Sequence, residues 1–420
     1  MMSGFIGHGR TEVTDPGELT SVDEHLHGVL DLLPRLEAIE LRLSDALGLV
    51  LADEVTSRVT VPAFANSAMD GYAVLSSDIA GADVGAPVTL AVTGEVLAGS
   101  DASPKVAAGT AVRIMTGAPL PEGADTVVPV ETTSAGEGRV AIHRAFEPGA
   151  NLRMPGEDLT PGQPLVAAGR RVTPADIGLL AAAGVSRVTC VPQPRVVVLI
   201  SGDELVRAED EPGPGRIRDA NGPMLAAMIK QAGALPFSAG IVPDDRKALM
   251  YAFDTNLGHA DLFICTGGAS AGTRDLIPDV INALGEARPA KVAMKPGMPQ
   301  VRGRIGGTPV IGLPGNPVST FVSFEVFVRP ALRKLQGRRD VARPSVLATA
   351  TEPLRASPGK RTYLRVRLAR EEGRWLATPT GAQGSHVISS IARADGLAVI
   401  GEDVAEVAAG DEVRVQLLVD

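Results

Sequence analysis

The chain has 420 residues, a net charge of −9 and an aromatic content of only 3%. This composition argues against a surface that binds nucleic acid or anionic membranes, and the length suggests three or four domains. The N-terminus has no apolar signal-peptide region and no stretch approaches 18 apolar residues, so we expect neither export nor a membrane span. Cys190 and Cys265 lack metal-ligand spacing and are expected to be reduced core thiols of a cytoplasmic protein.

The first half of the chain changes character twice. Helical periodicity begins after Ser21, an N-cap candidate, and a second helical segment is expected at residues 44–51. Short strands then dominate, until a helix that starts at Thr173 and ends at Gly184. We therefore predict an elongated helical-plus-strand domain made of residues 15–57 and 150–190, with a mostly-β domain of residues 58–149 inserted into it.

The second half of the chain alternates strand and helix from residue 191 to 337, which predicts an α/β domain with a mostly parallel sheet. Short alternating strands return in residues 342–420 and indicate a small β-barrel or sandwich. The expected fold class is therefore multidomain α/β plus β.

Two loops follow strands of the predicted α/β domain, SGDEL at 201–205 and TGGASAG at 266–272. Loops at the carboxyl ends of parallel strands expose backbone N–H groups and are common anion sites. Ordinary tight turns explain such loops equally well, so both interpretations stay open. The candidate anion-binding residues are Thr266, Gly267, Gly268, Ser270 and Gly272, and Glu204 places a carboxylate in the other loop at the same edge of the sheet.

Asp275 follows the second loop, and its carboxylate would repel a bare anion unless a divalent cation or a lysine intervened. Mg²⁺ suits carboxylates that act together with phosphate oxygens. Lys291 and Lys295 are four residues apart on a predicted strand, where such positions share a face. A solvated pair of lysines is the alternative explanation.

Three further turns contain polar residues: NSAMDGYA with Asp70, NLRMPGEDL with Arg153 and Asp158, and GLPGNPVS, which Pro314 and Pro317 stiffen. The spacing within these turns does not by itself indicate catalysis. The sequence lacks an HExxH metal motif and a GxSxG nucleophile motif.

These segments, taken in order, resemble the MoeA family of molybdopterin molybdenumtransferases, whose eukaryotic relatives include the E domain of gephyrin. The resemblance rests on NSAMDGYAV, RIMTGAPLPEGADTVV, LRMPGEDL, SGDEL, TGGASAG with its following Asp275, MKPGMPQ, GLPGNPVS and GAQGSH. It implies a central MoaB/MogA-like α/β domain, an inserted mostly-β domain, a helical-plus-strand domain and a C-terminal β-barrel. It also implies an elongated homodimer whose subunits share each site.

The resemblance implies that the enzyme hydrolyses adenylated molybdopterin with Mg²⁺, releases AMP and inserts molybdenum from molybdate. A molybdopterin adenylyltransferase would be the upstream partner. Asp244 and Asp275 are the implied metal ligands, and Arg365 with Ser385 the implied molybdate pair. The implied catalytic residues are Asp70, Asp158, Glu204, Asp244, Asp275, Lys291 and Lys295, and the implied substrate-binding residues are Thr116, Arg153, Pro314, Pro317, Arg365, Ser385 and the glycine-rich loop.

Two alternatives remain at this point. A gephyrin-like scaffold would use the same fold to bind a partner, although it would not need the polar set to be kept together. A paralogue that inserts tungsten, or one that adenylates molybdopterin, would carry nearly the same residues. Met298 also departs from the family pattern, where a second lysine is common, so one anion contact is either absent or supplied by Arg302.

Overall fold

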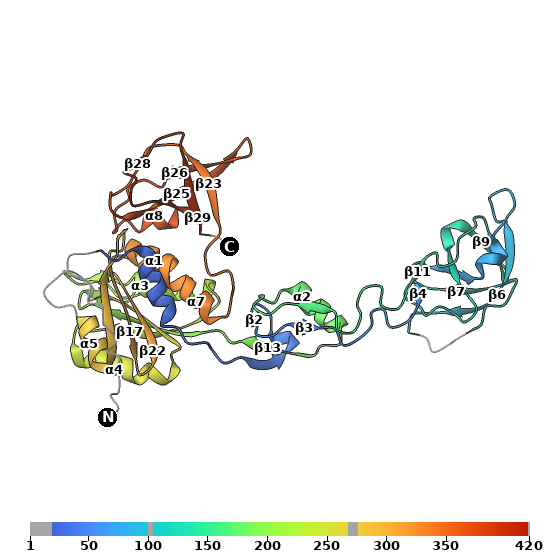
Figure 1. The fold of residues 1–420 in the computed structure, drawn as a ribbon, viewed down its shortest axis with the longest axis horizontal. Helices are drawn as coiled ribbons and strands as arrows, with labels where there is room; N and C mark the ends of the chain where they lie inside the picture. The colour runs from blue at the N-terminus through green and yellow to red at the C-terminus, as the bar shows by residue number, and fades with distance from the viewer. Residues whose placement is uncertain (1–18, 100–103, 268–275, 419–420) are drawn as a thin grey trace, which may run out of the picture.

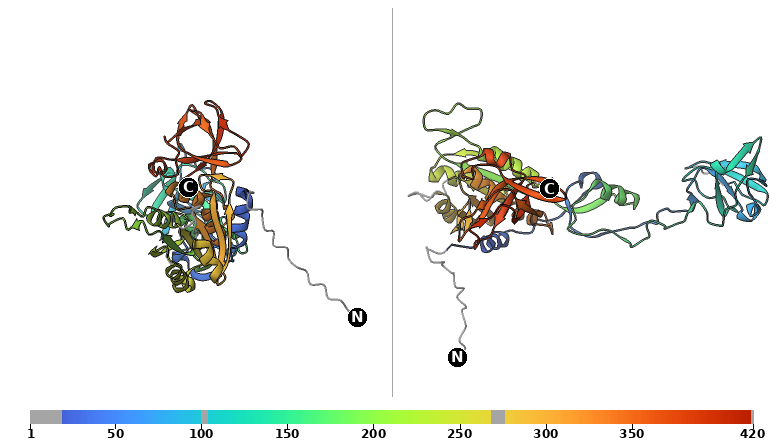
Figure 2. Two further views of the ribbon diagram at one scale, coloured as in Figure 1. Left: turned by 90° about the vertical axis from the view of Figure 1, so that its left-hand side faces the viewer. Right: turned by 90° about the horizontal axis from the view of Figure 1, so that it is seen from above.

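A computed structural model describes residues 19–99, 104–267 and 276–418 of the chain. The molecule is elongated, with the α/β domain and the C-terminal domain at one end, a β domain at the other and a smaller connecting domain between them (Figures 1 and 2). Within the described ranges, no helix combines the length and apolarity needed to cross a membrane. The expected multidomain α/β plus β class is confirmed.

The distal β domain is a six-stranded sheet in the order β8-β5-β7-β6-β10-β9, with a two-stranded ribbon, β11-β4, at its base. Its apolar residues form two clusters, one on each side of the sheet. The inserted mostly-β domain is thus confirmed. Its strands are β4 (Asn66–Ser67), β5 (Gly71–Val74), β6 (Val88–Val96), β7 (Thr110–Ile114), β8 (Thr126–Pro129), β9 (Thr133–Gly136), β10 (Arg139–Ile142) and β11 (Leu152–Arg153).

The connecting domain joins strands from both sides of the insertion around one small core. Thr173 caps helix α2 through a reciprocal capping box with Asp176, as the sequence predicts. The helix expected at residues 44–51 is wrong, because Gly48 takes a positive φ of 78° and the chain then pairs as a strand. The elements are β1 (Ile39–Arg42), a 3₁₀ turn (Leu43–Asp45), β2 (Val50–Leu51), β3 (Val55–Thr56), β12 (Pro164–Val166), α2 (Pro174–Ala182) and β13 (Arg187–Val191).

Helix α1 (Val22–Asp31) belongs to the α/β domain in space, and not to the connecting domain where we expected it. Its apolar stripe faces the last helix of the α/β domain: Val29 shares a core with Leu332, and the Lys334 ammonium donates to the Leu30 carbonyl at 2.9 Å. The predicted N-cap is present, since Ser21 Oγ accepts from the Glu24 N–H. The sequence pattern defines the helix, whereas its packing partner is distant in sequence.

The α/β domain has a six-stranded sheet in the order β17-β14-β18-β22-β21-β19, and its first four strands are parallel. One core packs α3 and the last helix on one face, and a second core packs α4 and α5 on the other. The elements are β14 (Arg195–Ser201), α3 (Asn221–Gln231), β17 (Leu235–Val242), α4 (Arg246–Asn256), β18 (Leu262–Thr266), α5 (Leu276–Leu284), β19 (Gly285–Lys291), β21 (Pro299–Ile305), β22 (Thr308–Leu313), and α6 (Pro317–Ser323), which continues through a π turn (Phe324–Val328) into α7 (Arg329–Leu335).

Lys291 and Lys295 do not share one strand, contrary to the prediction. Lys291 ends β19, which pairs with β21 in an antiparallel register. Lys295 lies in the separate strand β20 (Met294–Lys295), which crosses to pair with β25 of the C-terminal domain. The two lysines are separated because their backbones pair with two different sheets. The alternating residue pattern of a strand does not show this change of partner.

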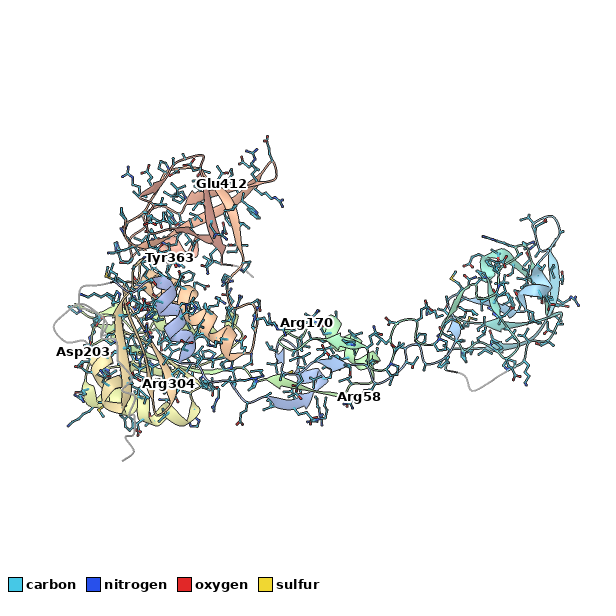
Figure 3. The ribbon with its side chains drawn as sticks, viewed as in Figure 1. Arg58, Arg170, Asp203, Arg304, Tyr363 and Glu412 are labelled. Carbon is cyan, nitrogen blue, oxygen red and sulfur yellow. The ribbon has the colours of Figure 1, made fainter. Side chains whose placement is uncertain are left out.

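The C-terminal domain is a closed barrel, because β25, β26, β23, β29 and β27 pair in turn and β27 pairs back to β25. The barrel interpretation is confirmed over the sandwich. Figure 3 shows Tyr363 where the barrel meets the α/β domain. The elements are β23 (Ser345–Ala350), β24 (Leu354–Arg355), β25 (Arg361–Glu371), β26 (Arg374–Pro379), α8 (Ser389–Ala392), β27 (Gly396–Ile400), β28 (Glu406–Val407) and β29 (Glu412–Leu417).

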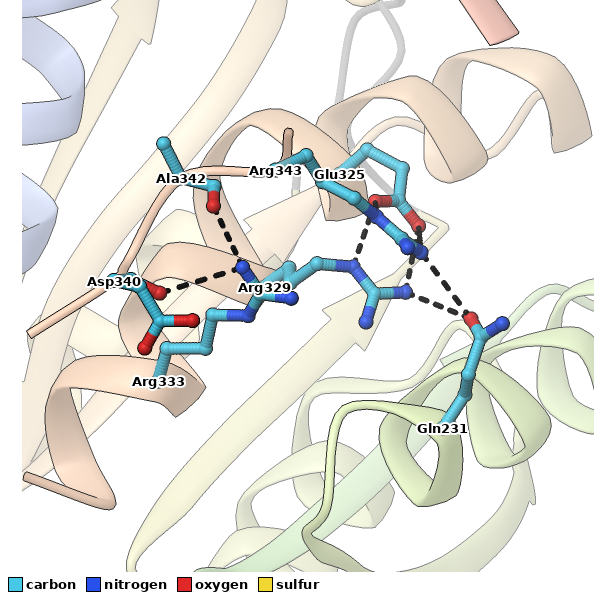
Figure 4. A network of polar contacts seen from close by, with 7 residues as sticks. All are labelled: Gln231, Glu325, Arg329, Arg333, Asp340, Ala342 and Arg343. Carbon is cyan, nitrogen blue, oxygen red and sulfur yellow. Dashed lines mark hydrogen bonds and ion pairs between the residues drawn. The ribbon is translucent and has the colours of Figure 1, made fainter. Parts of the chain in front are cut away.

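A buried ionic network fixes the segment that leads into the barrel (Figure 4). The Glu325 carboxylate accepts from Arg329 at 2.7 and 2.8 Å and from Arg343 at 2.9 Å, and all three residues are buried. Gln231 on α3 accepts from both guanidinium groups. The network therefore joins α3, the last helix and the interdomain segment through buried side chains.

Candidate active site

A pocket of about 320 Å³ opens at the carboxyl ends of the parallel strands β14, β18 and β22. The chain passes from β14 to β17 on one side and then returns to β18 on the other, so the strand order reverses at β14. Such a reversal leaves a crevice in which open α/β sheets bind ligands. The polar residues that line it are Ser201, Glu204, Arg218, Asp219, Asn221, Asp244, Thr266 and Asn316.

The loop after β14 and the loop after β17 meet at one wall of the pocket. The Ser201 hydroxyl donates to the Asp244 carboxylate, and the Asp244 N–H donates to Asp203 Oδ1 at 3.2 Å. The Glu204 carbonyl accepts from the Ile217 N–H at 2.8 Å, which holds the second half of this loop. The structure thus brings together the predicted residues Glu204 and Asp244, and Figure 3 shows Asp203 on the same domain.

Gly267 allows the floor of the pocket to form. Its φ is +97°, and a Cβ placed on it would lie 1.9 Å from the Ser201 carbonyl oxygen. The strand before it is buried, and the Thr266 hydroxyl donates to the Pro314 carbonyl at 3.1 Å. Only glycine fits this conformation and this space together. Pro317, the first residue of α6, completes the wall beside this turn.

Asn221 ties three parts of the pocket together. Its Nδ2 donates to the Gly315 carbonyl at 2.7 Å and to Thr266 Oγ1 at 3.3 Å. Asn221 is the first residue of helix α3, and its N-cap residue, Ala220, provides no side-chain capping bond. Asn221 Oδ1 is buried and has no hydrogen-bond partner among the described residues.

Some predicted residues are not placed. Gly268, Ser270, Gly272 and Asp275 lie outside the described residues. The predicted residues Thr266 and Gly267 line the pocket, whereas Pro314 contributes its carbonyl oxygen to the hydrogen bonds beneath it.

A second group of predicted residues lies in the distal domain and in the ribbon that leads to it. Asp70 Oδ1 accepts from both the Thr116 N–H and the Thr116 hydroxyl, each at 2.7 Å, and these bonds lower the pKa of Asp70, the backbone bond most. Arg153 is exposed on β11, and Asp158 is exposed where its N–H donates to the Val61 carbonyl. Figure 1 shows β4, β7 and β11 at the far end of the molecule from the pocket. A single chain therefore does not bring this group to the pocket.

The predicted anion-holding residues lie near the junction of the barrel with the α/β domain. Arg365 is fully buried on β25, and burial lowers its pKa to about 10. It donates to Ser390 Oγ at 3.2 Å and to two carbonyls, and forms no ion pair with a carboxylate in the described ranges. The predicted partner Ser385 follows Gly384, whose carbonyl accepts from Arg365, but no hydrogen bond joins the two side chains.

The two lysines have different surroundings. Lys295 Nζ donates to Ser357 Oγ of the barrel at 2.8 Å. Lys291 is exposed, and neither lysine lines the pocket. Arg302, considered as a substitute for the missing lysine at Met298, points elsewhere, because it donates to His25 Nδ1 of helix α1 at 3.1 Å.

The carboxylate oxygens around the pocket suit a hard cation that completes its coordination shell with oxygens of the bound substrate. Glu204, Asp219 and Asp244 line the pocket, yet the described residues include no cluster of three or more groups arranged to hold a metal ion. Mg²⁺ commonly binds through one or two carboxylates, several waters and substrate phosphates. The carboxylates that line the pocket fit such a site, which water and substrate complete. They do not form a site made of protein ligands alone.

Sequence reasoning missed the roles of Ser201, Arg218 and Asn221 in the pocket. Ser201 was part of a highlighted loop, but its bond to Asp244 joins segments 43 residues apart. Arg218 and Asn221 lie in a stretch, RIRDANG, whose only visible signal was the start of a helix. Contacts between distant segments defined their roles.

Comparison with known proteins covers nearly the whole chain. Family models match residues 20–184 as the MoeA N-terminal region (domain I and II), 197–334 as a probable molybdopterin binding domain and 348–418 as the MoeA C-terminal region (domain IV). Molybdopterin molybdenumtransferase 2 of Mycobacterium tuberculosis is 41% identical, with 94% of this chain and 99% of that protein covered. The molybdopterin molybdenumtransferase of Haemophilus influenzae is 33% identical, with 95% and 98% covered.

A solved structure of the molybdopterin biosynthesis MoeA protein from Pyrococcus horikosii is 32% identical and superposes with a TM-score of 0.82, covering 95% of this chain and 99% of that one. Identity at this level across the full length shows the family and the four-part architecture together. The chain therefore belongs to the MoeA family and is an enzyme of the molybdopterin molybdenumtransferase type, with a role in molybdenum cofactor biosynthesis.

Proposed function

We propose that the enzyme inserts molybdenum from molybdate into adenylated molybdopterin, with Mg²⁺-dependent hydrolysis of the phosphoanhydride and release of AMP. The observation that carries the proposal is the pocket at the strand-order reversal, where Asp244 and Glu204 face the floor formed by Gly267. Relatives named for molybdenum transfer to molybdopterin supply the chemical class.

The charge of the pocket supports a requirement for a divalent cation. A phosphoanhydride brings several anionic oxygens to a wall that already holds the carboxylates of Glu204, Asp219 and Asp244. We assign Asp244 and Asp275 as the Mg²⁺ ligands. When bound, the cation neutralises developing charge on the phosphate oxygens.

The chain's own residues orient the groups. The Ser201 hydroxyl holds one oxygen of Asp244, so the other oxygen is left for the pocket. The missing Cβ of Gly267 lets the chain pass directly against the Ser201 carbonyl, which sets the shape of this part of the pocket. Thr266 and Pro317 line the pocket and are proposed to bind the phosphate groups. Pro314, and Gly268, Ser270 and Gly272 outside the described residues, are proposed as further substrate-binding residues.

Molybdate, as substrate, is assigned to the barrel junction. Arg365 is a buried cation without a carboxylate partner in the described ranges, and Lys295 lies on the strand that pairs with β25. A tetrahedral dianion is a suitable counter-charge for a guanidinium and an ammonium group. Ser385 is the proposed hydroxyl donor, and Lys291 contributes further positive charge.

The distal residues require a second copy of the chain. Asp70, Thr116, Arg153 and Asp158 are proposed site residues, yet the domain that holds Asp70 and Thr116 lies at the opposite end of the elongated molecule from the pocket (Figure 1). A homodimer in which one subunit's distal domain reaches the other subunit's pocket would complete each site. A cytoplasmic molybdopterin adenylyltransferase would supply the substrate.

The test incubates purified enzyme with adenylated molybdopterin, Mg²⁺ and either molybdate or tungstate, and follows AMP. Asp244→Asn should slow Mg²⁺-dependent AMP release by about 10²-fold or more, because it removes the charge on a metal ligand. Asp245→Asn is the matched control, since Asp245 caps α4 and asparagine also caps helices.

Three results would change the proposal. Normal AMP release by the Asp244→Asn enzyme would remove Asp244 from the site. Failure of the wild-type enzyme to release AMP under any condition would favour a gephyrin-like scaffold. Faster release with tungstate than with molybdate would identify a tungsten-inserting paralogue.

A further inference from the structure

Arg218 lies at the pocket on a strap that precedes helix α3. The strap folds back as two short parallel strands, β15 (Leu205–Val206) and β16 (Ile217–Arg218). The Asp219 N–H donates to the Val206 carbonyl at 2.8 Å, which fixes the strap just beyond Arg218. Its backbone is therefore held beside the pocket, which Arg218 lines.

Arg218 carries the only positive charge among the described residues that line the pocket. The other ionised lining groups are the carboxylates of Glu204, Asp219 and Asp244. Its guanidinium is therefore the one side chain of the lining that attracts an anionic ligand directly. A planar guanidinium also matches two oxygens of one phosphate, which a lysine does not.

The present contacts of Arg218 are weak and leave part of its guanidinium available. Nη2 donates to Glu211 at 3.1 Å and Nε donates to the Ala208 carbonyl at 3.1 Å. Glu211 is 93% exposed and Arg218 is 45% exposed, so water screens this ion pair. A phosphate that enters the pocket competes with a single exposed carboxylate for the same donors.

We infer that Arg218 binds the phosphate of the nucleotide half of the substrate and thereby favours adenylated over unadenylated pterin. Glu211 is its resting partner, which the phosphate displaces. Arg218 is thus a specificity-determining residue. The inference rests on the proposed function, because it names the part of that substrate that Arg218 recognises.

The test measures the affinity for AMP by calorimetry, so it does not depend on molybdenum chemistry. Arg218→Ala should weaken AMP binding at least tenfold, and Arg218→Lys should weaken it less because the charge remains. Glu211→Gln should tighten it about two- to threefold, since Arg218 loses its competing partner. Adenosine, which lacks the phosphate, should bind wild-type and Arg218→Ala enzyme equally.

The matched control is Arg207→Ala, because Arg207 pairs with Asp210 on the same strap and does not line the pocket. It should leave AMP binding unchanged. Unaltered AMP affinity in Arg218→Ala, or absence of AMP binding by the wild-type enzyme, would overturn the inference. If AMP affinity falls as expected while wild-type enzyme releases no AMP from adenylated molybdopterin, the phosphate contact stands and the proposed reaction fails.

Discussion

Gly267→Ala is the most demanding test of the pocket floor. The new Cβ would lie 1.9 Å from the Ser201 carbonyl oxygen, whereas real Cβ atoms essentially never approach a heavy atom closer than 3.0 Å. One of the two strand ends must therefore move by about 1 Å, and displacements of that size cost about 10²-fold in rate when they misplace reacting groups. Alanine at a φ of +97° adds backbone strain of about 1–3 kcal/mol.

The assay is single-turnover AMP release from adenylated molybdopterin, with thermal unfolding measured in parallel. We expect a loss of about 10²-fold in the rate of AMP release. Gly240→Ala is the control, because Gly240 also has a positive φ of 82° but has open space around its added Cβ. It should carry the backbone strain without the clash, lose less stability than Gly267→Ala and react normally. Wild-type rates in Gly267→Ala would refute the view that this close approach shapes the site.

Two further predictions concern stability. In denaturant titrations, Glu325→Gln should lower the free energy of unfolding by about 3–5 kcal/mol, because it leaves the buried Arg329 and Arg343 without their carboxylate. The control is Glu286→Gln, which breaks an exposed ion pair and should change the free energy of unfolding by less than about 0.5 kcal/mol. Burial lowers the pKa of His25 to about 3, below its ordinary 6.5, so the unfolded state binds the proton first and stability falls as pH drops from 7 toward 3. Between pH 7 and 5.5 the free energy of unfolding should fall by about 1.3 kcal/mol because of His25. A His25→Gln variant whose stability has the same pH dependence as the wild type would contradict this.

The sequence predicted the elements whose pattern is local. Alternating strands and helices in residues 191–337 follow from apolar periodicity, and the caps at Ser21 and Thr173 follow from short motifs. The strap strands β15 and β16 have only two residues each, so periodicity says little there. Local patterns therefore gave the fold class but not every strand.

Long-range packing decided the features that the sequence did not reveal. Helix α1 was assigned to the wrong domain because its partner, the helix at residues 317–335, lies some 300 positions away. Lys291 and Lys295 separated because β20 pairs with a strand of another domain. Asn221 shows no link to the pocket in the sequence, because its bonds to Gly315 and Thr266 join segments that are distant in the chain.

The barrel and the distal domain are attached to the α/β domain in different ways. The residues of the proposed site therefore fall into two groups. The barrel is fixed to the α/β domain by the β20–β25 pairing, by the ion pair of Arg361 with Asp23 at 2.8 Å and by the buried Glu325 network. The distal domain is reached only through an antiparallel ribbon in which β3 pairs with β12, Val61 with Leu159 and β4 with β11.

Lys295 and Arg365 therefore keep their position relative to the pocket within one chain. In the proposed homodimer, the position of Asp70 and Thr116 relative to the pocket would depend instead on how the two chains associate. Substitutions in the ribbon should consequently change what Asp70 and Thr116 contribute to the proposed site. They should leave the pocket wall that contains Asp244 and the barrel junction intact, because the ribbon shares no hydrogen bond with either in the described ranges.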